Sequence, residues 1–390
     1  MASVRNFIKI FPAGSLPRVL YSRRMVAFYS GYHMSPEDVE ACERDDSAKR
    51  DVLEKYTQAL PAVVQKYSAA EEALIARAPE YQDRQNDEKL REEMLFCSLA
   101  YGFEPDEFMC YGLENKSPEE RKEYVSDREL MHDVCSMNDR IDIRIYNDKA
   151  NTYLRFRPYY QRDAVIINGR EDYDAFREYV SKHPVFVKKK VGEAMGRSVE
   201  LIDLQRDGVQ PDEVFRGLIE KGKHILEEKV EQSAVMAALN QSSVNTVRFI
   251  TYSTRNGIVI PYSFMKIGRS GSFVDNGGAG GILVGIDQST GRLNTEGFDE
   301  FVNRYPEHPD SKIPFMGYQL PDFDKAIALA EKLSGMTPSV KFIGWDFAHT
   351  DNGWVVIEGN GMSQLIGPQI VWEKGVKREV EKIKQTMDLM

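Results

Sequence analysis

The residues whose types and spacing can do chemistry are concentrated in a C-terminal hairpin. Apolar residues flank an Asp-Asn-Gly turn within Phe342–Asn360, which is typical of a β-hairpin. Centred on Asn352, this hairpin places Asp346 opposite Glu358, with Asn360 further along the same face. Two carboxylates and an amide oxygen are hard ligands that suit Mg²⁺ bound against a polyphosphate. The alternative is an ordinary exposed hairpin whose acidic residues only face water.

A second group is cationic and lies on a predicted antiparallel pair. Strands at Thr246–Thr254 and Ile258–Ile267 flank Asn256-Gly257, and they bring Arg248, Lys266 and Arg269 close to one another. Such a cluster would neutralise a transferring phosphoryl group or an acyl phosphate. A simple two-residue turn, however, pairs Arg248 with Met265 and points Lys266 to the other face. Either a bulge intervenes or Arg269 is the better partner of Arg248.

Three glycine-containing or acidic segments accompany these groups. A strand delivers Lys188, and a loop with Gly192, Gly196 and Ser198 follows, in which backbone N–H groups can approach phosphate oxygens. The alternative is a hairpin loop with a solvated lysine run. The segment Ile225–Gln232 is predicted as a strand with acidic residues at its end, able to present backbone to an adenine. The glycine-rich segment after Asn276 either lets backbone approach a substrate or is a flexible loop.

The elements that must position these residues indicate an α+β protein. Residues 37–135 are highly charged and predict helices, with helix starts at Ser35-Pro and Ser117-Pro. From about residue 138, short strands alternate with helices: Ala164–Asn168, Glu171–Ser181 and Pro184–Lys188 are predicted as strand, helix and strand. Longer antiparallel strands follow, and then an amphipathic helix over Asp322–Ser334. A helical N-terminal region therefore precedes a mixed region.

Composition sets limits on location and partners. A net charge of −10 over 390 residues argues against nucleic-acid binding, which needs an extended basic surface. No long apolar run or secretory signal is present, and four cysteines without pairing spacing fit reduced thiols, so a cytoplasmic protein without transmembrane segments is expected. Residues 1–36 carry five lysines and arginines and no acidic residue. They predict a plain surface segment, a basic arm for peripheral contact with a membrane or an acidic partner, or a transit-like leader.

The order of these parts resembles that of ATP-grasp enzymes, and most closely the sugar-transfer-associated branch. The resemblance covers roughly residues 138–390, and the N-terminal 130 residues match no family in this way. The matching segments are Asn245–Arg248, Ile267–Asn276, Gly280–Asp287, His308–Ser311, Ile343–Asp346 and Ile357–Asn360.

The resemblance implies a nucleotide held between two α+β subdomains. Its implied parts are an N-terminal region (1–137), a preceding segment (138–182), a lysine and glycine-loop subdomain (183–232) and a metal-binding subdomain (233–390). In this scheme Lys188 contacts the α- and β-phosphates, and the loop Gly196-Arg197-Ser198 closes over them. The position after Lys188, often proline in the superfamily, is Lys189 here, so the choice among residues 188–190 stays open. Strand alternation puts Lys188 and Lys190 on one face, and the distance to Gly192 favours Lys188.

The remaining implied site residues fall into three groups. The adenine hinge is formed by Glu227 or Glu228 with the backbone of Lys229 and Val230, and one or two Mg²⁺ ions are held by the C-terminal hairpin. Arg248, with Lys266 and Arg269, stabilises the γ-phosphate and an acyl phosphate. The metal ligands are Asp346, Glu358 and Asn360, and the further nucleotide-binding residues are Asn276, Gly280 and Gly281.

The function expected from this resemblance is that of an ATP-dependent ligase. A carboxylate attacks the γ-phosphate, and an amine or other nucleophile then displaces phosphate from the acyl phosphate. Branch membership implies a sugar, glycan precursor or amino acid among the small-molecule substrates, in glycan or sugar-conjugate biosynthesis. Two alternatives are a kinase that phosphorylates a hydroxyl and a catalytically silent nucleotide-binding module of a glycan-assembly complex.

Overall fold

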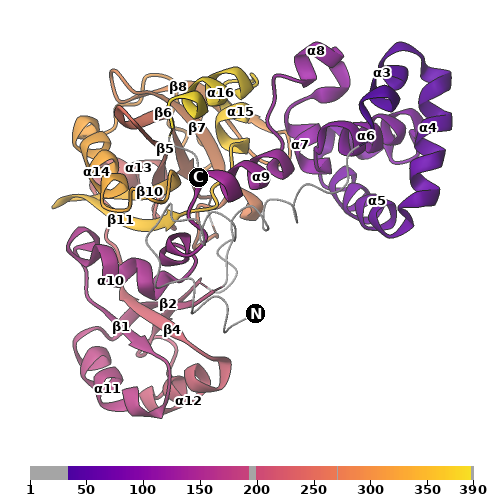
Figure 1. Cartoon of the computed structure of the whole chain (residues 1–390). Helices are drawn as coiled ribbons and strands as arrows, with labels where there is room; N and C mark the ends of the chain where they lie inside the picture. Colours follow the sequence, from indigo (N-terminus) through magenta and orange to yellow (C-terminus); the bar gives the residue numbers. More distant parts are fainter. Residues whose placement is uncertain (1–33, 193–198, 270, 388–390) are drawn as a thin grey trace.

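The computed structural model describes residues 34–192, 199–269 and 271–387. Its elements form an α+β fold with a helical N-terminal region, as the sequence predicts. Figure 1 shows the N-terminal helices at the upper right, a lobe built on a large sheet at the upper left and a smaller lobe below it. No helix within the described residues is long and apolar enough to cross a membrane.

Two helices of the N-terminal region begin where the sequence predicts, directly after Ser35 and directly after Ser117. The Ser35 side chain accepts a hydrogen bond from the N–H of Asp38, and Ser117 forms a capping box with Glu120. These bonds satisfy N–H groups that the first helical turn leaves unpaired. The elements are α3 (Pro36–Arg44), α4 (Asp46–Ala59), α5 (Pro61–Ile75), η1 (Pro79–Arg84), α6 (Glu88–Tyr101), α7 (Pro105–Cys110), η2 (Leu113–Asn115), α8 (Pro118–Arg121), α9 (Asp127–Met137), η3 (Asp142–Ile145) and α10 (Lys149–Tyr160).

The smaller lobe is a four-stranded antiparallel sheet of order β1-β4-β2-β3, with α11 and α12 on one face. Phe176 and Phe215 on these helices pack against Phe186 and Leu226 of the sheet, which leaves the other face for the site. The strand predicted to run to Gln232 ends at Glu228, and irregular backbone follows. The elements are β1 (Ala164–Ile167), η4 (Arg170–Asp172), α11 (Tyr173–Lys182), β2 (Val185–Lys190), β3 (Val199–Asp203), α12 (Pro211–Lys221) and β4 (His224–Glu228).

The larger lobe is a seven-stranded antiparallel sheet of order β11-β10-β5-β6-β7-β8-β9. Helix α14 packs on β5, β6 and β10, and α15 packs on β6, β7 and β8. Both predicted long strands and the predicted amphipathic helix are present. The elements are α13 (Ala234–Leu239), β5 (Thr246–Thr254), β6 (Gly257–Ile267), η5 (Gly277–Ala279), β7 (Ile282–Asp287), β8 (Arg292–Phe298), β9 (Arg304–Tyr305), α14 (Phe323–Gly335), β10 (Phe342–Thr350), β11 (Gly353–Asn360), α15 (Ile366–Val371) and α16 (Lys377–Gln385).

Two bulges set the register of the strands that carry the candidate site. The C-terminal hairpin turns on two residues, so Thr350 pairs with Gly353 rather than lying opposite Trp354 as a hairpin centred on Asn352 requires. A register shift next to Phe347 then restores the predicted pairing of Asp346 with Glu358. In the β5–β6 hairpin the turn lies one residue earlier than predicted and pairs Thr254 with Gly257, which alone would pair Arg248 with Ser263. A second shift, between Ile250 and Tyr252, makes Arg248 pair with Phe264, whereas the predicted turn gave Met265. The predicted bulge therefore exists, and it places Lys266 on the face of Arg248.

Candidate active site

A cavity of about 530 Å³ lies where the two lobes meet. Both sheets contribute to its lining, and so does the irregular segment that follows β4. The start of α9 adds Asp127 and Met131, so the helical N-terminal region also reaches this cavity. The predicted site residues that line it are Glu227, Glu228, Lys229, Val230, Arg248, Lys266, Asn276, Asp346, Glu358 and Asn360.

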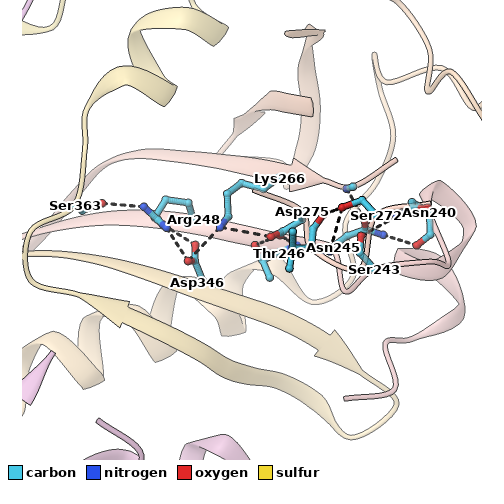
Figure 2. A network of polar contacts seen from close by, with 12 residues as sticks. Asn240, Ser243, Asn245, Thr246, Arg248, Lys266, Ser272, Asp275, Asp346 and Ser363 are labelled. Carbon is cyan, nitrogen blue, oxygen red and sulfur yellow. Dashed lines mark hydrogen bonds and ion pairs between the residues drawn. The ribbon is translucent and has the colours of Figure 1, made fainter. Parts of the chain in front are cut away.

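A buried ion-pair network occupies the large-sheet wall of the cavity (Figure 2). Arg248 binds Asp346 through two parallel hydrogen bonds, Nε to Oδ1 at 2.6 Å and Nη2 to Oδ2 at 2.7 Å. The Nζ of Lys266 lies 3.2 Å from Asp346 Oδ2 and 3.8 Å from Asp275 Oδ1. Arg248 also donates to the Ser363 hydroxyl at 2.9 Å. Two of the three predicted cations are therefore brought together on one carboxylate.

The pKa values in this network follow from burial opposed by charge pairing. Burial alone would raise the pKa of Asp346, but Arg248 and Lys266 outweigh it, so the pKa is lowered. For Asp275, burial outweighs the attraction of Lys266 and the pKa is raised. Asp275 also accepts hydrogen bonds from the N–H and hydroxyl of Thr246. The network thus lies at the start of β5 and the end of β6, which pair with each other.

The predicted metal ligands meet on β10 and β11. Asp346 pairs with Glu358, and Asn360 pairs with Gly344. Glu358 forms an ion pair of 2.9 Å with Lys149 at the start of α10. The side-chain nitrogen of Asn360 is buried and lacks a hydrogen-bond partner within the described residues. Two carboxylates and the side-chain oxygen of Asn360 at one cavity are donors that a hard divalent cation takes, whereas the unpartnered nitrogen of Asn360 can only donate a hydrogen bond.

This donor set has only two acidic members. Within the described residues, no cluster of three or more His, Cys, Asp or Glu side chains is arranged to hold a metal ion. A metal at Asp346, Glu358 and Asn360 would share its coordination with the oxygens of a bound polyphosphate. The metal assignment therefore stays a prediction.

The lysine that faces the cavity is Lys189, not the favoured Lys188. Lys189 shares a sheet face with Val187, and both line the cavity. Lys188 lies on the opposite face and pairs with Glu200 of β3 at 2.7 Å. Lys188 and Lys190 share one face of β2, as predicted. Phe186 lies on the same face and packs beneath α11 and α12, so Lys188 points toward these helices and away from the cavity. The loop residues Gly196, Arg197 and Ser198 lie outside the described residues.

The segment after β4 carries the predicted hinge. Glu227 is held by Arg162 and by Lys189, the latter at 2.9 Å. Burial disfavours the ionised form of Glu227, but these two cations outweigh it and lower its pKa to about 2. Glu228 exchanges hydrogen bonds with the backbone of Asp163. Glu227 is therefore committed to ion pairs, and Lys229 and Val230 line the cavity next to it.

The comparisons with known proteins agree with this architecture. The family model described as sugar-transfer associated ATP-grasp matches residues 136–385. The chain belongs to the sugar-transfer associated ATP-grasp family. No curated protein matches the chain in sequence.

Solved structures with some likeness include three enzymes of 11–13% identity. The chain resembles D-alanyl-alanine synthetase A from Vibrio cholerae (11% identity, TM-score 0.39, covering 63% of this chain and 67% of that one). It also resembles D-alanine–D-alanine ligase from Helicobacter pylori (13%, 0.38, 62% and 61%). The third is N5-carboxyaminoimidazole synthetase from Staphylococcus aureus complexed with ADP (11%, 0.37, 63% and 52%). At these values the likeness carries no argument about activity.

Besides Lys188, three predicted residues of this ATP-grasp chain lie outside the cavity lining: Arg269, Gly280 and Gly281. The Arg269 guanidinium lies 3.3 Å from Asp299 Oδ2 and donates to the Gly280 carbonyl and the Tyr305 hydroxyl. A Cβ on Gly281 would lie 2.1 Å from the carbonyl oxygen of Asp275. Gly280 and Gly281 therefore permit a tight backbone turn behind Asn276. The structure does not bring Arg269 to Arg248 and Lys266.

Sequence reasoning missed several residues that the ATP-grasp cavity contains. Asp275 lies inside Ile267–Asn276, a segment named for its resemblance to the family, and its acidic side chain next to predicted cations was an available signal. Lys149 and Arg162 precede β1, where no site residue was predicted, and reach the site only through the packing of α10 and the connection that follows it. Asp127 accepts a hydrogen bond from Gln364, and burial raises its pKa to about 6. Nothing in its local sequence connects it with the site.

Proposed function

We propose that this protein is an ATP-dependent ligase that activates a carboxylate as an acyl phosphate and transfers the acyl group to an amine or other nucleophile. The observation that carries the proposal is one cavity that gathers Arg248, Lys266, Asp346, Glu358 and Asn360 from the large sheet and Lys189 from the small sheet. Cations and hard oxygen ligands in the same cavity suit a polyphosphate with its metal. Membership of the ATP-grasp family supports the same conclusion.

The nucleotide would lie between the two lobes. Lys229 and Val230 offer backbone groups to the adenine, and Lys189 offers its ammonium group to the phosphates. Mg²⁺, held by Asp346, Glu358 and Asn360, would neutralise charge on the phosphate oxygens. Because burial lowers the pKa of Lys189, this lysine depends on its partners to stay charged.

The reaction needs charge neutralisation and positioning more than covalent help from side chains. A substrate carboxylate attacks the γ-phosphorus, the bond to the β–γ bridging oxygen breaks and ADP leaves. Arg248 and Lys266 stabilise the negative charge on the phosphoryl group during this transfer. The second nucleophile then attacks the acyl carbon, and phosphate leaves. An amine as this nucleophile gives a carbon–nitrogen bond.

The substrate class is proposed from the family name alone, since a fold does not fix a substrate. The description as sugar-transfer associated supports a sugar, a glycan precursor or an amino acid as one of the two small molecules. It also supports a place in polysaccharide or sugar-conjugate biosynthesis, inside the cytoplasm where ATP is available.

The first experiment is a thermal melt of the full chain with and without Mg²⁺ and ADP. Ligand at about a hundred times its dissociation constant adds roughly 2.7 kcal/mol to the free energy of unfolding. Glu358→Gln should lose the Mg²⁺-dependent part of this shift. The matched control is Glu373→Gln, because Glu373 is an exposed partner of Arg304 and is not part of the cavity lining.

A second stage measures phosphate release from ATP with pools of carboxylic acids and amines. The ligase proposal expects release that requires one member of each pool, and wild-type turnover in Glu358→Gln would remove the metal assignment. A stable phosphorylated hydroxyl product without phosphate release would contradict the ligase proposal. The absence of any ADP-dependent shift in the wild-type protein would contradict nucleotide binding itself.

A further inference from the structure

Arg162 connects the two lobes through its guanidinium group. It lies in the connection between α10 and β1, and its side chain is only 4% exposed. Its Nη1 donates to the carbonyl of Val356 on β11 at 2.6 Å and to that of Tyr160 at 3.2 Å. Its Nε donates to Glu227 Oε2 on β4 at 2.8 Å, and Nη2 donates to the same oxygen. One side chain therefore ties a strand of the large sheet to a strand of the small sheet.

The carboxylate of Glu227 is divided between two cations. Oε2 accepts from Arg162, whereas Oε1 accepts from Lys189 at 2.9 Å. The Glu227 side chain is 3% exposed, so neither cation is screened by bulk water. Two positive groups and one negative group leave one net positive charge at the cavity wall. Without Arg162, Glu227 alone would neutralise Lys189 and hold its ammonium group.

We infer that Arg162 is a positioning residue that frees the charge of Lys189 for a nucleotide phosphate. By binding Glu227, it satisfies the carboxylate that would otherwise capture the lysine. By binding Val356, it fixes Lys189 relative to β11, the strand that carries Glu358 and Asn360. This inference rests on the proposed function, since the nucleotide is its ligand.

The chain contains a matched control for this arrangement. Lys49, Glu93 and Arg121 form a second buried Lys–Glu–Arg group, with side chains 10%, 15% and 8% exposed. Arg121 donates to Glu93 at 2.9 Å and to the backbone carbonyl of Leu113 at 2.8 Å. This group lies in the helical N-terminal region and does not line the cavity. A purely structural effect of breaking a buried ion pair should appear equally in both groups.

The experiment measures dissociation constants for ADP with Mg²⁺ and for adenosine by calorimetry on the full chain. Arg162→Gln should weaken ADP binding by roughly tenfold, the loss expected for one charge-assisted contact. Adenosine, which has no phosphate, should change by less than about twofold on the same argument. Arg162→Lys should give an intermediate loss for ADP, and Arg121→Gln should lower the melting temperature without changing ADP affinity.

The double variant Arg162→Gln with Glu227→Gln provides the sharpest test. It removes one positive and one negative charge, so the net charge at the wall returns to that of the wild type and ADP affinity should recover. No recovery, or an equal loss for adenosine, would overturn the inference. Wild-type ADP affinity in Arg162→Gln, or in Arg162→Lys where the first variant fails to fold, would overturn it as well. A wild-type protein that binds no ADP would instead overturn the proposed function, and this inference with it.

Discussion

Asp346 is bound by Arg248 and Lys266 while its side chain is only 3% exposed. Taking these charges out of water is costly, and their mutual attraction offsets the cost only while all partners are present. A buried group of this kind contributes little to net stability, yet it is sensitive to the loss of one member. The function of this ion-pair network is to hold charged side chains in fixed positions at the cavity.

The Arg248–Asp346 pair can be tested by separating stability from activity. Arg248→Met removes the two-bond partner of Asp346 and leaves this buried carboxylate with Lys266, so it should lower the free energy of unfolding by roughly 3 kcal/mol. The double variant Arg248→Met with Asp346→Leu should recover most of this loss. Neither protein should release phosphate at a measurable rate. Urea unfolding and phosphate release measure the two effects, and an active double variant would contradict the catalytic assignment.

The two neighbouring lysines give a second prediction at this scale. Lys189→Ala should weaken ADP binding by about ten- to a hundredfold, because it removes a charge-assisted contact with phosphate. Lys188→Ala should leave the dissociation constant within about twofold, since its ammonium group points to Glu200 on the other face. Calorimetric titration of both variants decides between them. If Lys188→Ala weakened ADP binding and Lys189→Ala did not, Lys188 would be the lysine that contacts the phosphates.

Glu71 of the helical region gives a prediction about pH. Burial raises its pKa to about 7, Arg91 lies 3.8 Å away, and Oε1 accepts no hydrogen bond from the described residues. The folded state therefore keeps a proton on Glu71 that the unfolded state releases near the ordinary glutamate pKa of 4.5. Stability contributed by this group falls as the pH rises from about 4.5 to 7 and stays lost above that.

Glu71→Gln should remove this pH dependence. The variant should gain on the order of 1 kcal/mol over the wild type at pH 8 and little at pH 4.5. Denaturant unfolding at the two pH values measures the difference. A variant that is less stable than the wild type at pH 8 would show that the ion pair with Arg91 outweighs the cost of burial.

At the scale of elements, the sequence predicted which strands pair better than the exact contacts of their side chains. The turn residues and alternation of β10 and β11 were enough to pair Asp346 with Glu358, although the turn itself is one residue shorter. A bulge corrects the difference, and a bulge depends on packing between strands that local sequence does not specify. Lys189 rather than the favoured Lys188 faces the cavity, because Phe186 packs beneath helices and Lys188 shares its face. Arg162 and Lys149 were missed because only tertiary packing brings α10 to the cavity.

Strand β10 approaches the loop after β11 closely at Gly344. A Cβ at this position would lie 2.1 Å from the Ser363 hydroxyl and 3.2 Å from a carbon of Arg248. Gly344→Ala should therefore displace Ser363 and Arg248, lower the free energy of unfolding by about 1–3 kcal/mol and reduce phosphate release. Gly335→Ala is the control, because no atom lies within 4 Å of its added Cβ.

A compensating variant tests whether the steric contact is the cause. Ser363→Gly removes the side chain that Gly344→Ala would meet, so the double variant should recover stability while losing the hydrogen bond to Arg248. Chemical denaturation of the single and double variants gives the coupling energy. If the losses of stability in the two single variants simply added in the double variant, the alanine would disturb strand β10 itself and not its contact with Ser363.

For the whole molecule, the question is whether the helical N-terminal region is separate from the ATP-grasp region. The family match begins at residue 136, close to the proposed boundary at 137. Contacts across this boundary are nevertheless numerous and buried. Gln369 is fully buried and both accepts from the N–H of Val125 and donates to its carbonyl, at 2.8 and 2.9 Å. Lys377 and Lys384 of α16 pair with Glu129 and Asp133 of α9.

These contacts lead us to propose that α9 belongs functionally to the ATP-grasp region, because it also supplies Asp127 to the cavity. Gln369→Leu leaves the backbone groups of Val125 and the Tyr111 hydroxyl without the partner that Gln369 provides, and it should lower the free energy of unfolding by roughly 2–4 kcal/mol.

A fragment of residues 138–390 loses every one of these contacts and exposes the face of α15 and α16. It should aggregate or melt well below the full chain, and it should bind ADP weakly. Melting curves and ADP titrations of the fragment, the variant and the full chain measure this dependence. A monomeric fragment with the melting temperature and ADP affinity of the full chain would instead make residue 137 a true domain boundary and leave Asp127 without a part in nucleotide binding.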